Sequence, residues 1–237
     1  MQQPLADAVI SDSHLVEEAR AGDRDAYLQL WVRHVDTARR VAATASISER
    51  SVEAAVNRAF SRVLGQITVD LDPLGPFRPY LLRMLHEEFG IRDAAALPTT
   101  NLLRAFRRLP VRAQTVLWYA VVEQVAPAET AMFMGEQEAV IAPLLAESID
   151  QLRAEWLVEL VCDPTLTDTC AWLVQRADGR ARGELTQVAA DRFDRHVAGC
   201  EFCQGFLRTL EAFPEALRDD FQPLFTLQLP AESAGDL

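Results

Sequence analysis

The 237-residue sequence contains no lysine, so all 23 of its basic residues are arginine. Acidic residues outnumber them, with 35 aspartates and glutamates, and the formal net charge is −12. A general nucleic-acid binder presents a basic surface, so this balance argues against that class. The surplus is largest in residues 158–237, which hold seven arginines and 14 acidic residues. We therefore expect this part to be the least suited to contact DNA.

Long apolar runs and catalytic motifs are also missing. No stretch approaches the 18 uncharged apolar residues of a membrane span, and the N-terminus lacks the pattern of a signal peptide. Both absences predict a cytoplasmic protein. There is no glycine-rich phosphate loop and no serine nucleophile motif. Adjacent carboxylates such as Glu87 and Glu88 do not face each other on a helix, so we expect them to be solvated. We predict that the protein is not an enzyme.

Alternating strand patterns bounded by turns are essentially absent as well. Apolar residues recur instead at intervals of three and four, as in 13–45 and 51–67, which is typical of amphipathic helices. The sequence AGD at 21–23 predicts a break between two helices, and Ser51 is the expected N-cap of the next. A further helix follows a Pro/Gly-rich turn within 70–90. We predict an all-α fold.

Residues 101–157 have the outline of a helix-turn-helix. Pro110 is placed to open one helix, because proline suits the first turn. A short helix is expected over 126–134, Gly135 makes the turn, and a longer third helix follows. A short helix, a glycine turn and a longer helix are typical of DNA-binding helix-turn-helix units.

One histidine and two cysteines form a compact metal-ligand pattern near the C-terminus. His196, Cys200 and Cys203 are spaced His-x3-Cys-x2-Cys. These three ligands can close on one tetrahedral Zn²⁺ if a fourth comes from elsewhere. Cys170 is the expected fourth ligand, since a helix, a glycine-containing turn and a second helix would return the chain to it. Cys162 is the alternative, either as a ligand or as a small apolar residue at a helix end.

Two other interpretations of the cluster remain open, a thiol–disulfide pair without metal and unconnected structural residues. In a cytosolic chain, metal binding or redox activity is more frequent than a structural disulfide. A site with four protein ligands has no open position, which favours a structural or redox-sensing role over hydrolysis. The other histidines lack ligand partners at such spacing, and the tryptophans fall on apolar stripes. We expect both sets to be helix-surface or core residues: His14, His34, His86, Trp31, Trp118, Trp156 and Trp172.

Two segments resemble extracytoplasmic-function sigma factors. LVEEARAGDRDAYLQLWVRHVDTARRVA and FRPYLLRMLHEEF are similar to the core-binding and promoter-melting domain of that family. LLRAFRRLPVRAQTVLWYAVVEQVAPAETAMFMG is similar to the second sigma domain, a helix-turn-helix that reads the −35 element. The resemblance covers about 12–157 and implies binding to core RNA polymerase and promoter DNA. The arrangement of Cys170, His196, Cys200 and Cys203 resembles the zinc-binding anti-sigma domain over about 163–210, which implies that these four residues hold zinc.

The sequence departs from the sigma family where function depends on it. In the helix over 51–64, the family's acidic positions are Ala54 and Arg58. The third helix has Ala142, Pro143 and Leu144 where the family has Lys, Ser and Arg. Ala, Pro and Leu neither hydrogen-bond to base edges nor anchor phosphates.

Proline also removes a backbone donor, so we expect Pro143 in the first turn of a helix that starts late. Packing of this helix against protein is therefore favoured over −35 recognition. The candidate DNA-contacting residues are Asn57, Arg58, Arg62, Gln137, Ala142 and Leu144.

The predicted organisation follows the two resemblances. It comprises a sigma region-2-like domain (10–92), a linker (93–100), a region-4-like helix-turn-helix (101–157), a zinc-binding anti-sigma-like domain (158–220) and a tail that is a candidate tether (221–237). The first hypothesis is a sigma-like regulator inhibited in cis by the zinc module, through intramolecular contact at high effective concentration. The second is a degenerate protein-interaction module that uses apolar surface around 142–145. A plain helix-turn-helix DNA-binding regulator is the third.

Overall fold

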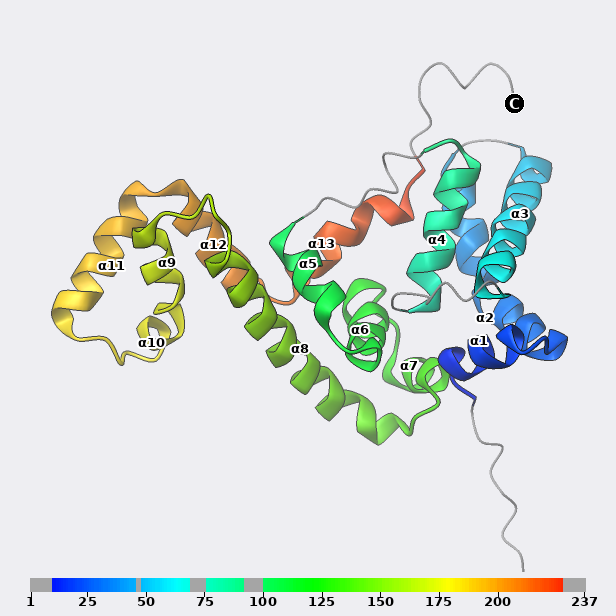
Figure 1. The fold of residues 1–237 in the computed structure, drawn as a ribbon, viewed down its shortest axis with the longest axis horizontal. Coiled ribbons are helices and arrows are strands. Elements are labelled where there is room, and N and C mark those ends of the chain that lie inside the picture. Colours follow the sequence, from blue (N-terminus) through cyan, green and yellow to red (C-terminus); the bar gives the residue numbers. More distant parts are fainter. Residues whose placement is uncertain (1–9, 46–47, 69–75, 92–99, 228–237) are drawn as a thin grey trace, which may run out of the picture.

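The structure is a computed structural model that describes residues 10–45, 48–68, 76–91 and 100–227. Within these ranges every regular element is a helix, which confirms the all-α prediction. Figure 1 shows an elongated molecule in which the long helix α8 runs from a larger body to a small group of helices at the other end. None of the described helices has both the length and the apolar character needed to span a bilayer.

The N-terminal unit consists of four helices packed around one core, α1 (Asp12–Arg20), α2 (Arg24–Ala43), α3 (Glu49–Thr68) and α4 (Phe77–Glu88). The predicted break at 21–23 is confirmed. Gly22 has a φ of 97°, and Oδ1 of Asp23 accepts a hydrogen bond from the Asp25 backbone N–H at 2.8 Å, which caps α2.

The predicted N-cap at Ser51 is wrong, because α3 already begins at Glu49. The hydroxyl of Ser48 instead lies 3.2 Å from the backbone nitrogen of Ser51 and accepts its hydrogen bond. Ser48 and Ser51 have the same capping chemistry, so N-cap propensity alone does not predict which of them precedes the helix. The Pro/Gly-rich turn and the predicted linker at 93–100 fall almost entirely outside the described residues.

The middle unit consists of α5 (Asn101–Arg108), α6 (Val111–Leu117), a π-helical turn η1 (Trp118–Val122), α7 (Pro127–Met134) and α8 (Glu138–Val161). Gly135 ends α7 with a φ of 65°, the left-handed conformation that glycine adopts without strain. The expected sequence of short helix, glycine turn and longer helix is therefore present. A small cluster of Val116, Ala131, Ile141 and Leu144 packs inside it.

The expectation that Pro143 starts a late helix is wrong. Helix α8 begins at Glu138, so Pro143 lies in its second turn, with its ring exposed. The hydrogen bond lost at proline is the one that Ala139 would have accepted, close to the solvent-exposed end of the helix. At its other end α8 is tied to α5, because the buried Glu159 pairs with Arg104 at 2.9 Å and Arg108 at 2.7 Å.

The cysteine unit comprises α9 (Asp168–Val174), α10 (Ala177–Ala181), α11 (Gln187–Gly199) and α12 (Glu201–Glu211). It is joined to the end of α8 by aromatic packing. The indole of Trp156 lies 5.4 Å from the ring centroid of Phe206 and 5.6 Å from that of Phe213.

The chain then returns from the cysteine unit to the larger body. Residues 215–227, here called the C-terminal segment, form α13 (Glu215–Phe221) and the 3₁₀ helix η2 (Gln222–Phe225). Helix α13 contacts α5 and η1, and η2 contacts α4 (Figure 1). Phe221, Leu224 and Leu227 are buried. The first part of the expected tail is thus packed into the body, and 228–237 lie outside the described residues.

Candidate functional site

Four side chains from three helices converge in the cysteine unit. The Sγ of Cys170 on α9 lies 3.4 Å from Nε2 of His196 on α11 and 3.7 Å from Sγ of Cys200, at the α11–α12 junction. With Cys203 on α12, all four ligand atoms lie within 4.8 Å of one another. The structure therefore brings together the four residues that the sequence selected.

Local capping explains why the ligands point inward. Thr167 caps α9, and its hydroxyl accepts from the backbone N–H of Cys170. Cys200 ends α11 and precedes α12, so its thiol lies at the N-terminal end of α12. There the backbone N–H of Cys203 donates to the thiol and lowers the pKa of Cys200. Burial raises the pKa of the Cys203 thiol.

Two of these distances are close to the separation expected between ligands of a tetrahedral metal ion. With zinc–sulfur bonds of about 2.3 Å, ligand atoms at tetrahedral angles lie about 3.8 Å apart. The observed 3.4 and 3.7 Å separations are close to that value. Three thiols and one imidazole are also a donor set that zinc takes in structural sites. The four residues are positioned to bind a metal ion.

The competing cysteine is placed elsewhere. Cys162 follows the last residue of α8 and is exposed, and it does not belong to the four-residue cluster. All four cysteines are free thiols. Of the two candidates for the fourth ligand, the structure brings Cys170 to the site.

A second cluster of polar groups joins the N-terminal and middle units. The hydroxyl of Tyr119 in η1 donates to Oδ2 of Asp12 in α1 at 2.8 Å. Nε2 of His34 lies 3.0 Å from the same carboxylate, and Arg33 pairs with its other oxygen at 2.9 Å. Burial alone would raise the pKa of Asp12, but His34 and the hydrogen-bond donors outweigh it and lower that pKa.

Arg78 of α4 extends this cluster across the junction. Its Nε donates to Nδ1 of His34 at 3.0 Å, and its guanidinium forms an ion pair with Glu123 at the end of η1. The guanidinium also lies over the rings of Tyr119 and Phe133, 5.0 and 4.7 Å from their centroids. Burial raises the pKa of Glu123. Two units that share so many buried polar contacts cannot separate without leaving charges unpaired.

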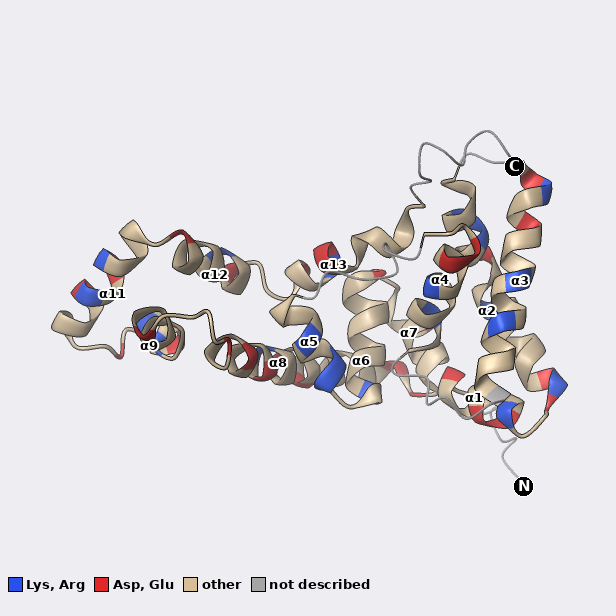
Figure 2. Cartoon of the chain, turned by 45° about the horizontal axis from the view of Figure 1, so that its top comes forward, with Lys and Arg blue, Asp and Glu red and all other residues tan. Residues whose placement is uncertain are grey.

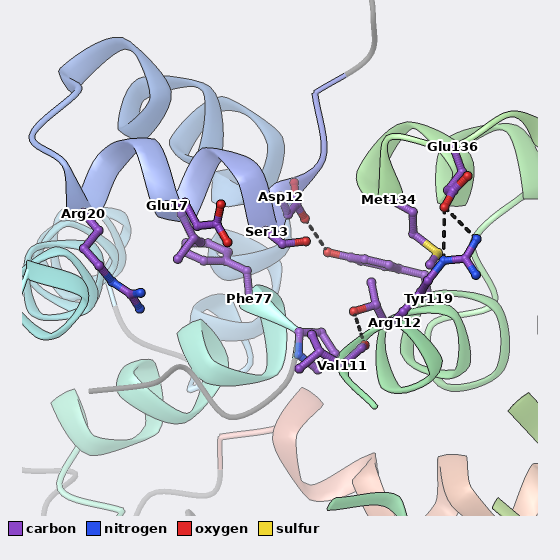
Figure 3. A pocket seen from close by; sticks show the side chains of 13 residues that line it. Asp12, Ser13, Glu17, Arg20, Phe77, Val111, Arg112, Tyr119, Met134 and Glu136 are labelled. Atoms are coloured by element: carbon purple, nitrogen blue, oxygen red, sulfur yellow. Dashed lines mark hydrogen bonds and ion pairs between the residues drawn. The ribbon is translucent and has the colours of Figure 1, made fainter. Parts of the chain in front are cut away.

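Figure 3 shows a cleft beside these contacts, with a volume of about 400 Å³. One wall comes from α1 and the start of α4, and the other from α6 and α7. Arg112 is paired with Glu136 at 2.7 Å along the second of these walls, and carboxylates and guanidinium groups occur together in the lining. Because the lining carries both acidic and basic side chains, the cleft favours neither an anionic nor a cationic ligand. The cleft marks the boundary between the two units.

The C-terminal segment covers the same junction from another side. The ring of Phe221 packs edge-on against Phe106 and Trp118, and Phe225 stacks on Trp118 at 5.8 Å. Nε2 of His86 in α4 is 3.1 Å from the carbonyl oxygen of Leu224. The Leu227 backbone N–H donates to the hydroxyl of Thr44 at 2.8 Å. This short segment therefore contacts both units.

The candidate DNA contacts on α3 are largely occupied by acidic partners. Asn57 is exposed. Arg58 pairs with Glu88 at 2.7 Å, and Arg62 pairs with Glu88 at 3.1 Å and with Glu87 at 2.5 Å. The expectation that Glu87 and Glu88 are merely solvated is wrong, since the neighbouring helix supplies their partners. These ion pairs neutralise the charge that phosphate anchoring would need.

The candidate contacts on α8 are equally unsuited to DNA. Gln137 and Ala142 are exposed, but Leu144 is only 8% exposed and packs in the small helix-turn-helix core. As a candidate DNA contact, Leu144 was therefore a wrong choice. No arginine occurs between residues 138 and 152. The exposed acidic residues along this part of the helix, coloured red in Figure 2, are Glu138, Glu147 and Asp150.

The remaining histidines and tryptophans lie on helix surfaces or in the core, as expected. His14 is exposed, whereas His34 and His86 are fully buried. Trp118 and Trp156 are buried. The link between His34 and Asp12 was missed, because the two residues are 22 positions apart on different helices and helical spacing does not relate them. Trp172 is half-buried, and the guanidinium groups of Arg176 and Arg192 both lie over its ring.

Comparison with known proteins gives little to set beside this geometry. No model of a protein family matches the chain, and no curated protein matches it. A solved structure described as "Structure of CnrH in complex with the cytosolic domain of CnrY" is similar at 23% sequence identity and a TM-score of 0.32. The similarity covers 60% of this chain and 95% of that one. At this TM-score the likeness assigns neither a fold nor a function.

Proposed function

We propose that the protein is a sigma-factor-like transcription regulator held closed in cis by its C-terminal segment. The N-terminal and middle units would be its sigma-like parts. The cysteine unit would be an anti-sigma-like module that binds zinc and anchors the segment. The observation that carries this proposal is the contact of one short segment with both units, through Phe221 on Trp118 and Leu227 on Thr44.

Covalent attachment makes this arrangement effective. A segment linked to its target acts at an effective concentration of about millimolar, so it needs little affinity of its own. In the closed state the faces that meet at the junction are buried, including Asp12, Arg78 and Tyr119. A partner that spans both units would have to separate them first. Core RNA polymerase is the partner we propose, which also places the protein in the cytoplasm.

A protein partner fits the surfaces better than promoter DNA does. The arginines at 58 and 62 are paired, and the exposed part of α8 around Ala142 carries carboxylates. Direct base recognition requires donors and acceptors that reach groove edges, and phosphate binding requires free cations. We therefore expect weak promoter recognition even when the two units are free.

Binding to core RNA polymerase tests the proposal. The intact chain is compared with a full-length chain carrying Phe221→Ala and Leu224→Ala, which removes the buried anchors of the segment. Phe202→Ala is the matched control, because Phe202 is 43% exposed. We expect the double variant to bind and the intact and control chains not to bind. If the double variant is folded and fails to bind, in-cis inhibition of a polymerase-binding protein is wrong.

The second candidate is a protein-interaction module without promoter activity. The observation that favours it is the exposed helix face of Ala142, Pro143 and acidic residues where base-reading groups would be required. Transcription from candidate promoters distinguishes the two functions. A released chain that binds polymerase and starts promoter-specific transcripts would contradict this alternative.

A further inference from the structure

A polar cleft of about 730 Å³ opens where the N-terminal unit, the middle unit and the C-terminal segment meet. Helix α2 contributes Thr37, Arg40 and Thr44, and the turn after η1 contributes Gln124. The C-terminal segment contributes Arg218 and Gln222. The volume of the cleft lies within the range of small-molecule sites, about 300–1,000 Å³.

Two arginines from different parts of the chain line this cleft, Arg40 of α2 and Arg218 of α13. Arg40 hydrogen-bonds to the hydroxyl of Thr37 at 2.9 Å, and Arg218 is half-buried on α13. Neither forms an ion pair with another described residue, whereas Arg58, Arg62 and Arg78 all do. Two guanidinium groups that share one cleft and lack a direct ion pair can attract an anion from solution.

The carboxylates in the lining do not supply that anion. Glu123 attracts Arg40 without a direct ion pair, because its oxygens are bound by Arg78 and by the indole N–H of Trp118. Asp219 is exposed to solvent. Gln124 and Gln222 also line the cleft, and an amide side chain can donate hydrogen bonds. The cleft therefore presents two guanidinium groups that its two carboxylates, Glu123 and Asp219, do not bind in a direct ion pair.

We propose that this cleft binds a phosphate-bearing small molecule of nucleotide size, whose phosphate groups bridge Arg40 of the N-terminal unit and Arg218 of the C-terminal segment. The guanidinium fork matches two phosphate oxygens at once. Because the two arginines belong to parts that must separate on release, the ligand favours the closed arrangement. This regulatory consequence rests on the proposed function, whereas the binding itself does not.

Calorimetric titration of the metal-loaded full chain tests the site. The probes are pyrophosphate, ATP and citrate, the last being a polyanion without phosphate. We expect pyrophosphate and ATP to bind at one site and citrate to bind more weakly. Arg40→Gln and Arg218→Gln should each weaken binding at least about tenfold, since each removes a charge-assisted hydrogen bond.

Arg195→Gln is the matched control. Arg195 is exposed on α11 in the cysteine unit, and its substitution changes net charge by the same amount. The proposal is overturned if the intact chain binds neither phosphate probe at millimolar concentration, if citrate binds as tightly, or if the control weakens binding as much as Arg218→Gln does. No polymerase is present in this titration, so these results would overturn the ligand site without testing the proposed function.

Hydrogen exchange of residues 215–227 tests the bridging role separately. Pyrophosphate should slow exchange there in the intact chain and not in Arg40→Gln, which leaves the C-terminal segment itself unchanged. Binding without any change in exchange would overturn the bridge.

Discussion

The ring of Phe221 lies edge-on against the indole of Trp118, with 5.0 Å between the centroids and 84° between the ring planes. These residues are 103 positions apart, and both are buried. Edge-to-face aromatic pairs add about 0.5–1.5 kcal/mol beyond the burial of their surface. This contact makes the C-terminal segment part of the core of the larger body.

Removal of that ring should loosen the closed state. We expect Phe221→Ala to lower the free energy of unfolding by about 3–5 kcal/mol, because a large buried side chain is replaced by a cavity. Chemical denaturation measures the change. Phe202→Ala should cost less than about 1 kcal/mol, since Phe202 is 43% exposed. Equal costs for the two variants would contradict a buried anchor.

The metal site should bind one zinc per chain. Cys203→Ser is expected to lose the metal, because Cys203 is one of the four converging ligands and is fully buried. Cys162→Ser should retain it. Elemental analysis gives the stoichiometry, and a chelator should lower the melting temperature of the intact chain. Retention of zinc by Cys203→Ser would show that these four residues are not the ligand set.

The ion pair between Arg78 and Glu123 should contribute strongly to the junction of the two units. Both side chains are less than 10% exposed. We expect Glu123→Gln to cost about 3–5 kcal/mol, because it leaves a buried guanidinium without its counter-ion. Glu136→Gln is the control at an exposed pair, with an expected cost of about 0–1 kcal/mol.

A double-mutant cycle with Arg78→Met separates the pair energy from other losses. The double variant should cost clearly less than the two single changes together. Strict additivity would mean that the two side chains do not interact.

Stability should fall on mild acidification. Burial lowers the pKa of both His34 and His86, because it penalises the charged imidazolium. The unfolded chain binds these protons below about pH 6.5 while the folded chain resists them, so the free energy of unfolding decreases as pH falls through that value. Each group contributes a slope of up to about 1.4 kcal/mol per pH unit.

His86→Gln tests this pH dependence. This variant should reduce the slope of the free energy of unfolding below pH 6.5 by up to about 1.4 kcal/mol per pH unit. His14→Gln, at an exposed position, should leave the slope unchanged. Denaturation at several pH values measures both. An unchanged slope in His86→Gln would contradict the role of this buried histidine.

Arginine substitutions on α8 should distinguish packed positions from exposed positions of this helix. Leu144→Arg is expected to destabilise the protein by at least about 2 kcal/mol, because a charge would enter the small core with Val116 and Ile141. Ala142→Arg should change stability by no more than about 0.5 kcal/mol, since Ala142 is exposed. Thermal or chemical denaturation checks both. A tolerated Leu144→Arg would mean that this helix face is not packed.

Local patterns in the sequence determined the helices and the candidate metal ligands. Apolar spacing, the AGD break and Gly135 act within one or two helical turns, so the elements they predict are present. His196, Cys200 and Cys203 lie within eight residues of one another, and ligand chemistry selects that spacing. Only Cys170 required the chain to return from a distance. The sequence favoured it over Cys162, and the fold brings it to the other three residues.

Tertiary structure decided what the local patterns leave open. The partners of Asp12, Glu88 and Trp118 come from helices that are distant in sequence, at Tyr119, Arg58 and Phe221. Helical periodicity shows that a face is apolar or charged, but it does not show which other face will cover it. The burial of Leu144 and the return of the C-terminal segment are of this kind. Both depend on which surfaces meet when the helices pack, and that is settled by the free energy of the whole core.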